Sequence, residues 1–195
     1  MNRPSSIVSS PLKVGLDFLN KVLWLRYVEN IMRRGQWLTP SKGKGYPDLA
    51  TRALCQRLST LKLGESQRQL PLYALVDWDP DGLGILSTYK YGSASLQEHD
   101  NPRLPNIKWL GLHGNDACRS AETREGQSLL QMTERDRRKG RKMLEWSYLQ
   151  EEGLEEHWRR EVQMMLMLNY KAEIQSLDEL LGGVQGWLED RLLSG

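Results

Sequence analysis

Cysteine and long hydrophobic runs are both scarce in this chain of 195 residues. Its two cysteines, Cys55 and Cys118, lie far apart, so they indicate neither a disulfide framework nor a zinc site, and they favour a reducing compartment. No stretch approaches the roughly 18 consecutive apolar residues of a membrane span. The first residues also lack the apolar core of a signal peptide. We therefore expect neither secretion nor a membrane partner.

The chain also lacks a large excess of either positive or negative charge. The 27 Lys and Arg residues against 25 Asp and Glu give a net charge of +2, which is too small to indicate nucleic-acid binding from the total alone. The hydrophobic fraction of 39% and the charged fraction of 27% are typical of a globular protein. The length suits one sizeable core, or a core with an appendage.

The clearest chemical signal is the segment Leu-Tyr-Ala-Leu-Val-Asp-Trp-Asp-Pro-Asp-Gly at residues 72–82. A short apolar run that ends in Pro and Gly predicts a buried strand followed by a turn. Three carboxylates, those of Asp77, Asp79 and Asp81, come directly after the strand, where α/β folds bind ligands. Two carboxylates separated by one residue can share a hard divalent cation, and Mg²⁺ fits best.

Several kinds of site share this acidic pattern. A calcium loop of the EF-hand type needs a helix in front and a Glu at its twelfth position, where this chain has Thr88, so that class is excluded. A haloacid-dehalogenase phosphatase would have Thr or Val in place of Asp81, and its later motifs are not found. A Toprim site would use Asp77 and Asp79 to hold Mg²⁺ against a DNA phosphate. Spacing alone favours a simple solvated turn.

Hydrophobic periodicity and turn residues predict an α/β half followed by a helical half. Helical crossovers between the strands predict that these strands pair in parallel. The expected elements are a helix within 12–32, a short strand at 36–38, a helix from Pro47, a strand at 70–76, a helix at 82–91 ended by Gly92, a strand at 107–112, a polar loop at 114–126, and helical segments at 133–150, 154–168, 171–181 and 184–193.

The segments around the acids, taken in order, resemble the meiotic DNA double-strand-break proteins related to the topoisomerase VI A subunit. Residues 43–52 are similar to the G-K-G-x-P-D-x-x-T-R segment of that family, and residues 77–82 to its D-x-D-P-x-G segment. The other segments that resemble the family are 89–93, 108–112, 133–136, 158–161 and 171–175. A lone D-x-D is unspecific, whereas this ordered set, over about residues 43 to 195, is specific.

The resemblance implies an α/β Toprim fold, a Rossmann-like parallel sheet with flanking helices, followed by a helical C-terminal part. We expect residues 33–195 to form this domain and residues 1–32 to be a poorly matched leader, partly disordered or helical. Asp77 and Asp79 would bind Mg²⁺, while a tyrosine attacks DNA by transesterification during meiotic recombination. The implied partners are DNA, a second copy in a homodimer, other meiotic recombination proteins and a topoisomerase VI B-like subunit. The implied location is the nucleus.

The sequence also departs from the family pattern. Asp81 stands where the family usually has Tyr or His, so we assign it no catalytic role. The family has a Glu at the tip of an earlier strand and a tyrosine in a preceding winged-helix domain. The leader offers only Asp17 and Glu29 as acids. Too few residues separate Glu29 from Gln36 for the family's helix to fit, and whether Glu29, Asp17 or no residue replaces the family's Glu stays open. We therefore assign no catalytic residue. The alternative function is a DNA- or partner-binding Toprim module that has lost cleavage activity.

Basic residues suggest where DNA could bind. Lys42, Lys44 and Arg52 flank a Gly-rich turn whose backbone N–H groups could approach a phosphate, although solvated surface lysines explain that spacing equally well. The densest basic run lies at residues 135–142. Because acids interleave with it, a solvated helix face is the favoured interpretation there.

Overall fold

The structure, a computed structural model, describes residues 22–25, 46–60, 62–63, 68–69, 71–93, 101–123, 129–150, 153–180 and 182–193. At its centre is a three-stranded sheet in the order β1–β4–β5. Strand β4 (Leu72–Leu75) pairs in parallel with β5 (Lys108–Gly111), as the helical crossover predicts. Strand β1 (Val22–Leu25) adds to the sheet in antiparallel orientation. These four residues form a strand where the sequence favoured a helix.

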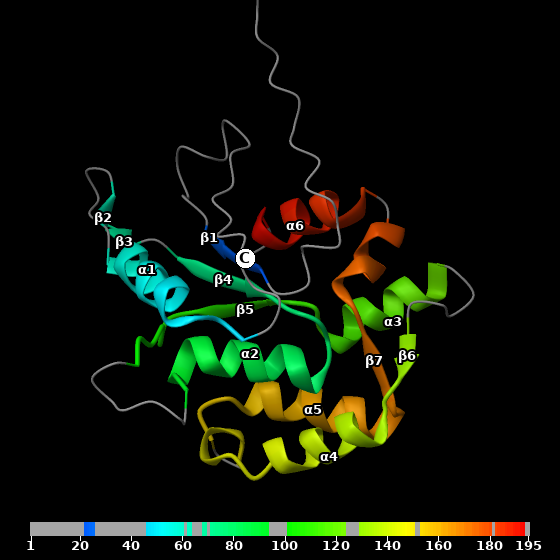
Figure 1. Ribbon diagram of the computed structural model, residues 1–195. Helices are drawn as coiled ribbons and strands as arrows, with labels where there is room; N and C mark the ends of the chain where they lie inside the picture. The colour runs from blue at the N-terminus through cyan, green and yellow to red at the C-terminus, as the bar shows by residue number, and fades with distance from the viewer. Residues whose placement is uncertain are drawn as a thin grey trace, which may run out of the picture.

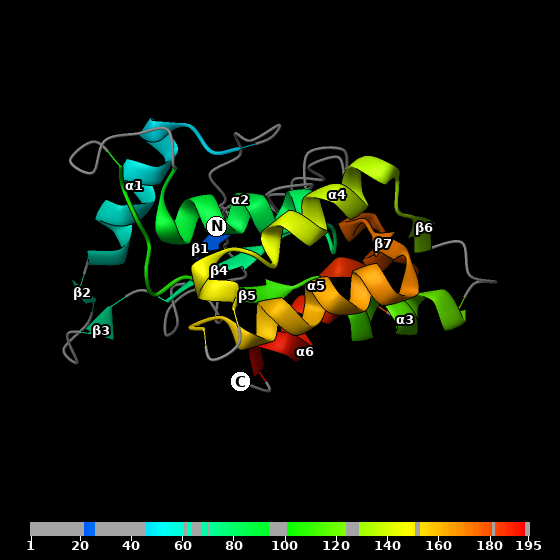
Figure 2. The same ribbon diagram turned by 90° about the horizontal axis from the view of Figure 1, so that it is seen from below.

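Helices flank the central sheet. Helix α2 (Pro80–Tyr91) lies on one side of it and α6 (Gly183–Leu193) on the other (Figure 1). Helices α4 (Glu134–Met143) and α5 (Glu156–Leu168) lie beyond α2, and both are in view when the molecule is seen from below (Figure 2). The sheet with its flanking helices confirms the predicted α/β class.

The remaining elements lie around this centre. Helix α3 (Gly114–Thr123) follows β5, and a separate antiparallel pair is formed by β6 (Leu129–Gln131) and β7 (Tyr170–Ala172). The others are α1 (Leu49–Thr60), β2 (Lys62–Leu63), β3 (Arg68–Gln69) and two short 3₁₀ helices, η3 (Ser147–Leu149) and η4 (Ile174–Glu179). Among the described helices, none combines the length and apolarity needed to cross a bilayer.

Several expected elements are confirmed, and two are wrong in addition to the helix expected where β1 lies. The helices expected at 82–91, 154–168 and 184–193 are present as α2, α5 and α6. The expected polar loop at 114–126 is instead largely helix α3, and the expected helix at 171–181 begins as strand β7. In both places tertiary contacts, described below, decide the local structure. The short strand expected at 36–38 lies outside the described residues.

Helix α2 is buried on most of its surface, because it packs between the sheet and the α4–α5 pair. Leu83, Ile85 and Leu86 are almost completely inaccessible to solvent. The helix ends at Gly92, whose φ of 88° is readily adopted only by glycine and whose N–H bonds the carbonyl of Thr88. The sequence predicted this glycine-ended terminus correctly.

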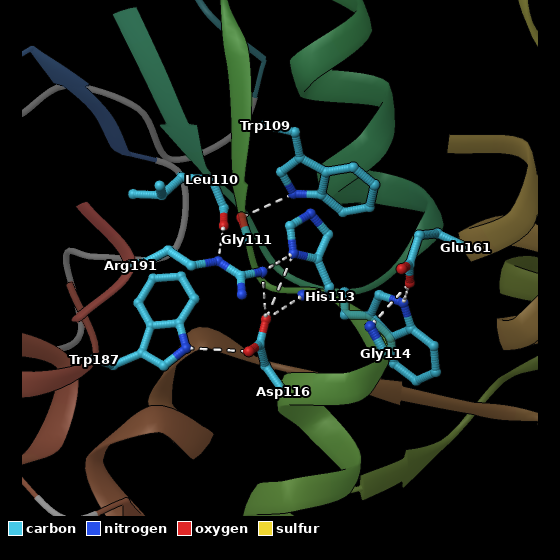
Figure 3. Close-up of polar contacts among 10 residues, drawn as sticks. Trp109, Leu110, Gly111, His113, Gly114, Asp116, Glu161, Trp187 and Arg191 are labelled. Carbon is cyan, nitrogen blue, oxygen red and sulfur yellow. Dashed lines mark hydrogen bonds and ion pairs between the residues drawn. The ribbon is translucent and has the colours of Figure 1, made fainter. Parts of the chain in front are cut away.

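The C-terminal helix is held to the sheet by a polar network (Figure 3). Trp187 Nε1 donates to Asp116 Oδ1 at 3.2 Å, and Arg191 donates to Asp116 Oδ2 at 3.4 Å and to His113 Nδ1 at 2.5 Å. A Cβ atom on Gly111 would lie 2.5 Å from the Trp187 ring, so glycine permits this close approach. The network gives His113 a structural role.

Candidate metal centre

The acid turn, residues 77–82, begins where β4 ends. The parallel ladder continues one residue beyond the strand, since Val76 N–H bonds the Gly111 carbonyl at 2.8 Å and Leu112 N–H bonds the Val76 carbonyl at 2.7 Å. The next residue, Asp77, is 6% exposed, and its Oδ1 accepts a hydrogen bond from Ile174 N–H at 3.0 Å. The first carboxylate is therefore fixed in orientation by a backbone group 97 residues later in the chain.

The second carboxylate belongs to Asp79, which caps the N-terminus of α2. Its backbone is extended, with φ of −150°, and its Oδ1 accepts a hydrogen bond from Gly82 N–H at 2.5 Å. Pro80 follows in the first helical position, where the missing N–H costs nothing. Gly82 is required here, because a Cβ atom would lie 2.3 Å from the Asp77 carbonyl oxygen.

Trp78, between the two carboxylates, is completely buried and bonded on two sides. Its backbone exchanges two hydrogen bonds with Ala172 of β7, at 2.9 and 3.1 Å. Its indole N–H donates to Oε2 of Glu161 in α5 at 2.7 Å. The same oxygen accepts the Gly114 N–H, at the start of α3, at 2.9 Å (Figure 3). Asp77 and Asp79 thus flank a residue that cannot shift without breaking its hydrogen bonds to β7 and α5.

Two lysines supply positive charge beside the acid turn. Lys139 of α4 forms an ion pair with Asp81 and also donates to the Tyr46 hydroxyl at 2.9 Å. Lys171 of β7 lies 2.9 Å from Asp136, which closes a capping box with Thr133 at the start of α4. The pairing of Asp81 with Lys139 agrees with the absence of a catalytic assignment for this acid.

The carboxyl group of Asp79 has a raised pKa. Burial is the largest cause that raises the pKa of its carboxyl group, and the nearby Asp81 and Asp136 raise it further. The Gly82 N–H and the Lys171 ammonium act in the opposite direction without cancelling the rise. The charged carboxylate is therefore destabilised in this environment, and a bound cation would reverse that effect.

Asp77 and Asp79 are suitable ligands for Mg²⁺, but they are too few to form a complete metal site from protein groups alone. Within the described ranges, no group of three or more His, Cys, Asp or Glu side chains could hold a metal ion. Mg²⁺ is commonly bound through one or two carboxylates, with waters and substrate phosphates completing its octahedron. Asp77 and Asp79, each with one carboxylate oxygen oriented by a backbone N–H, meet that requirement.

Of the three residues expected to bind DNA, the structure describes only Arg52. Lys42 and Lys44 lie outside the described residues. Arg52 is 2% exposed, and its Nη1 donates to Asn101 Oδ1 at 2.8 Å and to the Pro102 carbonyl at 3.3 Å. Burial lowers the pKa of this guanidinium. A DNA phosphate could not reach Arg52 without displacing residues 101–102. Arg52 therefore does not occupy the surface position expected for it, and we do not propose it as a DNA-binding residue.

Several residues of the site were not singled out from the sequence. Glu161 and Lys171 lie in the segments 158–161 and 171–175 that resemble the family, and that resemblance could have drawn attention to them. Lys139 lies in the basic run of α4, where nothing in the local sequence distinguishes it from its neighbours. Its role depends on the contact between α4 and the start of α2, which only the fold reveals.

A parallel pair of strands flanked by helices, with two oriented aspartates at the carboxyl end of β4, is the arrangement of a Toprim-like α/β domain. The sequence comparison agrees: residues 30–182 match the family model for the Toprim domain that Spo11 shares with the A subunit of topoisomerase 6. The chain belongs to this family. The match begins inside the segment that we treated as a leader.

Three relatives illustrate the similarity. The chain is 38% identical over 134 residues to "Meiotic recombination protein SPO11-2" of Oryza sativa subsp. indica, and 38% identical over 136 residues to "Meiotic recombination protein SPO11" of Mus musculus. It is also 38% identical over 135 residues to the A3 subunit of DNA topoisomerase 6 of Oryza sativa subsp. indica. Each match covers 69% of this chain but only 31%, 32% and 28% of the respective relative. The matched region thus spans about a third of the length of these relatives.

Proposed function

We propose that this chain is a Mg²⁺-binding Toprim domain that holds the metal through Asp77 and Asp79 beside a DNA backbone. The complete protein would break both DNA strands in meiotic recombination by tyrosine transesterification. The observation that supports this proposal is the rigid presentation of the two carboxylates at the carboxyl end of β4. One is oriented by Ile174 N–H and the other by Gly82 N–H, on either side of the buried Trp78.

The residues of the chain would have distinct tasks in that chemistry. When bound, Mg²⁺ supplies positive charge to a phosphate and to the oxygen that leaves it. Asp77 and Asp79 position the ion, and the Trp78 contacts keep their separation constant. Lys139 offsets the charge of Asp81, which keeps this third acid from competing for the ion. The tyrosine nucleophile is not among the residues that we assign in this chain.

The family supports further proposals about partners. We propose that the protein acts as a homodimer in which the metal of one protomer serves the tyrosine of the other. Other meiotic recombination proteins, together with a topoisomerase VI B-like subunit, are proposed as additional partners, and the nucleus as the location. These proposals draw on relatives that are named meiotic recombination proteins and on one named for DNA topoisomerase 6.

Thermal unfolding in increasing Mg²⁺ tests the metal site. A ligand that binds only the folded state stabilises it by about 2.7 kcal/mol at 100 times its Kd. We expect the melting temperature of the wild type to rise with Mg²⁺. The double variant Asp77→Asn with Asp79→Asn should show no such rise. The measurement is differential scanning fluorimetry, supported by calorimetric titration of Mg²⁺.

A matched control separates loss of ligands from loss of charge. Glu145→Gln with Glu189→Gln removes two carboxylates from exposed positions and should keep the full response to Mg²⁺. Equal stabilisation of the wild type and the Asp77, Asp79 double variant would disprove the metal site. If the wild type binds DNA but does not respond to Mg²⁺, the non-catalytic binding module becomes the better description.

A further inference from the structure

The charges of helix α4 are separated by face, although they alternate in the sequence. Glu134 pairs with Arg137 at 2.8 Å and with Arg141 at 3.3 Å, so one carboxylate is shared by two arginines along one side of the helix. Asp136 points into the protein, where it is 6% exposed and bound to Lys171. Glu134 also lies near enough to Arg138 to interact with its charge, so it borders the other basic residues of the helix, whereas Asp136 points away from them.

Three basic residues remain on a face of their own. Arg135, Arg138 and Lys142 follow each other at intervals of three and four residues, which places them side by side on an α-helix. All three are exposed. None forms an ion pair with a carboxylate in the part of the chain that the structure describes. We call this set the α4 basic face. Arg138 interacts with the charge of Glu134, but the three cations are otherwise exposed to solvent.

The α4 basic face borders the acid turn. Lys139 lies four residues after Arg135 and three before Lys142, so it neighbours both on the helix surface. The Lys139 ammonium reaches the acid turn through its ion pair with Asp81. Helices α2 and α4 lie beside each other when the molecule is seen from below (Figure 2). Positive charge therefore continues from the proposed metal site along the outside of α4.

We propose that the α4 basic face binds the phosphate backbone of duplex DNA, next to the phosphate held at the metal. From Arg135 to Lys142 the helix rises about 10 Å. Successive phosphates of one strand advance by about 3.4 Å along the duplex, so the three cations match about three phosphates. This inference rests on the proposed function and deepens it, because it names a binding surface that the acid turn alone does not supply.

The salt dependence of DNA binding tests the proposal directly. The triple variant Arg135→Gln, Arg138→Gln and Lys142→Gln keeps good helix formers at all three positions. We expect it to bind a short fluorescent duplex roughly tenfold or more weakly, whatever the base sequence. The slope of log K against log salt should fall by about 2 to 3, since each phosphate contact contributes about 0.9. The measurement is fluorescence anisotropy at several salt concentrations, with the full chain.

A control variant removes the same charge elsewhere. Arg57→Gln, Lys108→Gln and Arg119→Gln take three exposed cations from α1, β5 and α3 and should leave affinity and slope close to wild type. If both triple variants weaken binding equally, the effect is one of net charge, and the α4 basic face is refuted. It is also refuted if the α4 variant binds like the wild type, or if polyglutamate competes as well as DNA at equal charge, which would indicate an acidic protein partner.

The proposal can fail independently of the metal site. Binding is measured both in EDTA and in Mg²⁺, and the Asp77→Asn with Asp79→Asn variant serves as the reference for loss of metal. If Mg²⁺ affects the wild type and the Asp77, Asp79 variant equally, while the α4 variant still binds DNA more weakly, the result would count against the metal site only. A wild-type chain that binds no duplex under either condition would overturn both the α4 proposal and the DNA part of the proposed function.

Discussion

The indole N–H of Trp78 and a carboxylate oxygen of Glu161 form a buried hydrogen bond of 2.7 Å between residues 83 positions apart in the sequence. The same oxygen receives the Gly114 N–H at 2.9 Å. One carboxylate therefore ties together the acid turn, the start of α3 and the middle of α5. The position of the two proposed metal ligands depends on a residue that would not itself touch the metal.

This relationship predicts a strong energetic coupling. Trp78→Phe removes the indole donor, and Glu161→Gln replaces the charged acceptor by an amide, so each should destabilise the fold by about 1–3 kcal/mol. The double variant should lose clearly less than the sum, because both changes remove the same bond. Urea unfolding followed by circular dichroism measures all three. Losses that add to within about 0.5 kcal/mol would show that the two residues act independently.

Asp79 is predicted to lower the stability of the metal-free fold. Because its pKa is raised in the folded state, stability falls as the pH rises from the ordinary aspartate pKa through the folded value, and the cost remains at neutral pH. Asp79→Asn should therefore stabilise the protein in EDTA, since Asn also caps helices well. Asp79→Ala, which loses the cap, should be less stable than Asp79→Asn by about 1 kcal/mol. Chemical unfolding at pH 7 gives both values, and a less stable Asn variant would contradict the prediction.

Two glycines of α2 are predicted to differ in their tolerance of a methyl group. A Cβ atom at Gly82 would meet the Asp77 carbonyl at 2.3 Å, whereas one at Gly84 would meet the movable side-chain ends of Tyr46 and Lys139, at 2.5 and 3.0 Å. Gly82→Ala should cost about 1–3 kcal/mol through overpacking. Gly84→Ala should change stability by less than about 1 kcal/mol, because the gain in helix propensity offsets the displaced side chains. Melting temperatures of the two variants provide the comparison.

Asp116 is predicted to contribute to stability in a pH-dependent way. Burial tends to raise the pKa of its carboxyl group, but hydrogen bonds from His113 and Trp187 and the charge of Arg191 outweigh burial and lower it. A lowered pKa stabilises the fold above the ordinary aspartate value, and this contribution is lost as the pH falls below about 4. Asp116→Asn should thus be less stable than the wild type at pH 7, with a difference that shrinks toward acid. A difference that stays constant from pH 7 to about 3 would contradict the assignment.

The parts of the fold that the sequence predicted correctly depend on local signals. The run at 72–76 ends in Asp and Pro, and α2 ends at Gly92, so the strand, the turn and the following helix all carry strong signals in the chain itself. The ordered set of family-like segments supplied the Toprim class, which no single element could have supplied.

The errors arose where distant contacts decide the local structure. The polar segment after Gly114 resembles a loop by composition, yet it is a helix whose start is bonded by Glu161 and whose Asp116 is bonded by α6. Lys171 and Ala172 have a helical pattern, but Ala172 pairs with Trp78 and extends β7. Neither partner could be identified from the local sequence.

The sequence suggested which acids could bind a metal but not which residues hold them in place. The D-x-D spacing led to the prediction that Asp77 and Asp79 are ligands, and this stays a prediction, whereas Arg52 looked like a surface cation and is buried. The basic residues of α4 looked evenly mixed with acids, because alternation along the chain conceals separation around a helix. Only the contacts of Glu134 and Asp136 show which of the basic residues these acids pair with.

The bond from Ile174 N–H to the Asp77 carboxylate also sets the order in which the site is completed during synthesis. The two residues are 97 positions apart, and at about 5–20 residues per second a ribosome needs roughly 5–20 s to cover that distance. Throughout this interval the nascent chain displays its acidic motif without the backbone donor that orients it. A polypeptide released before residue 174 would carry the whole D-x-D signature but could not position its first carboxylate in this way.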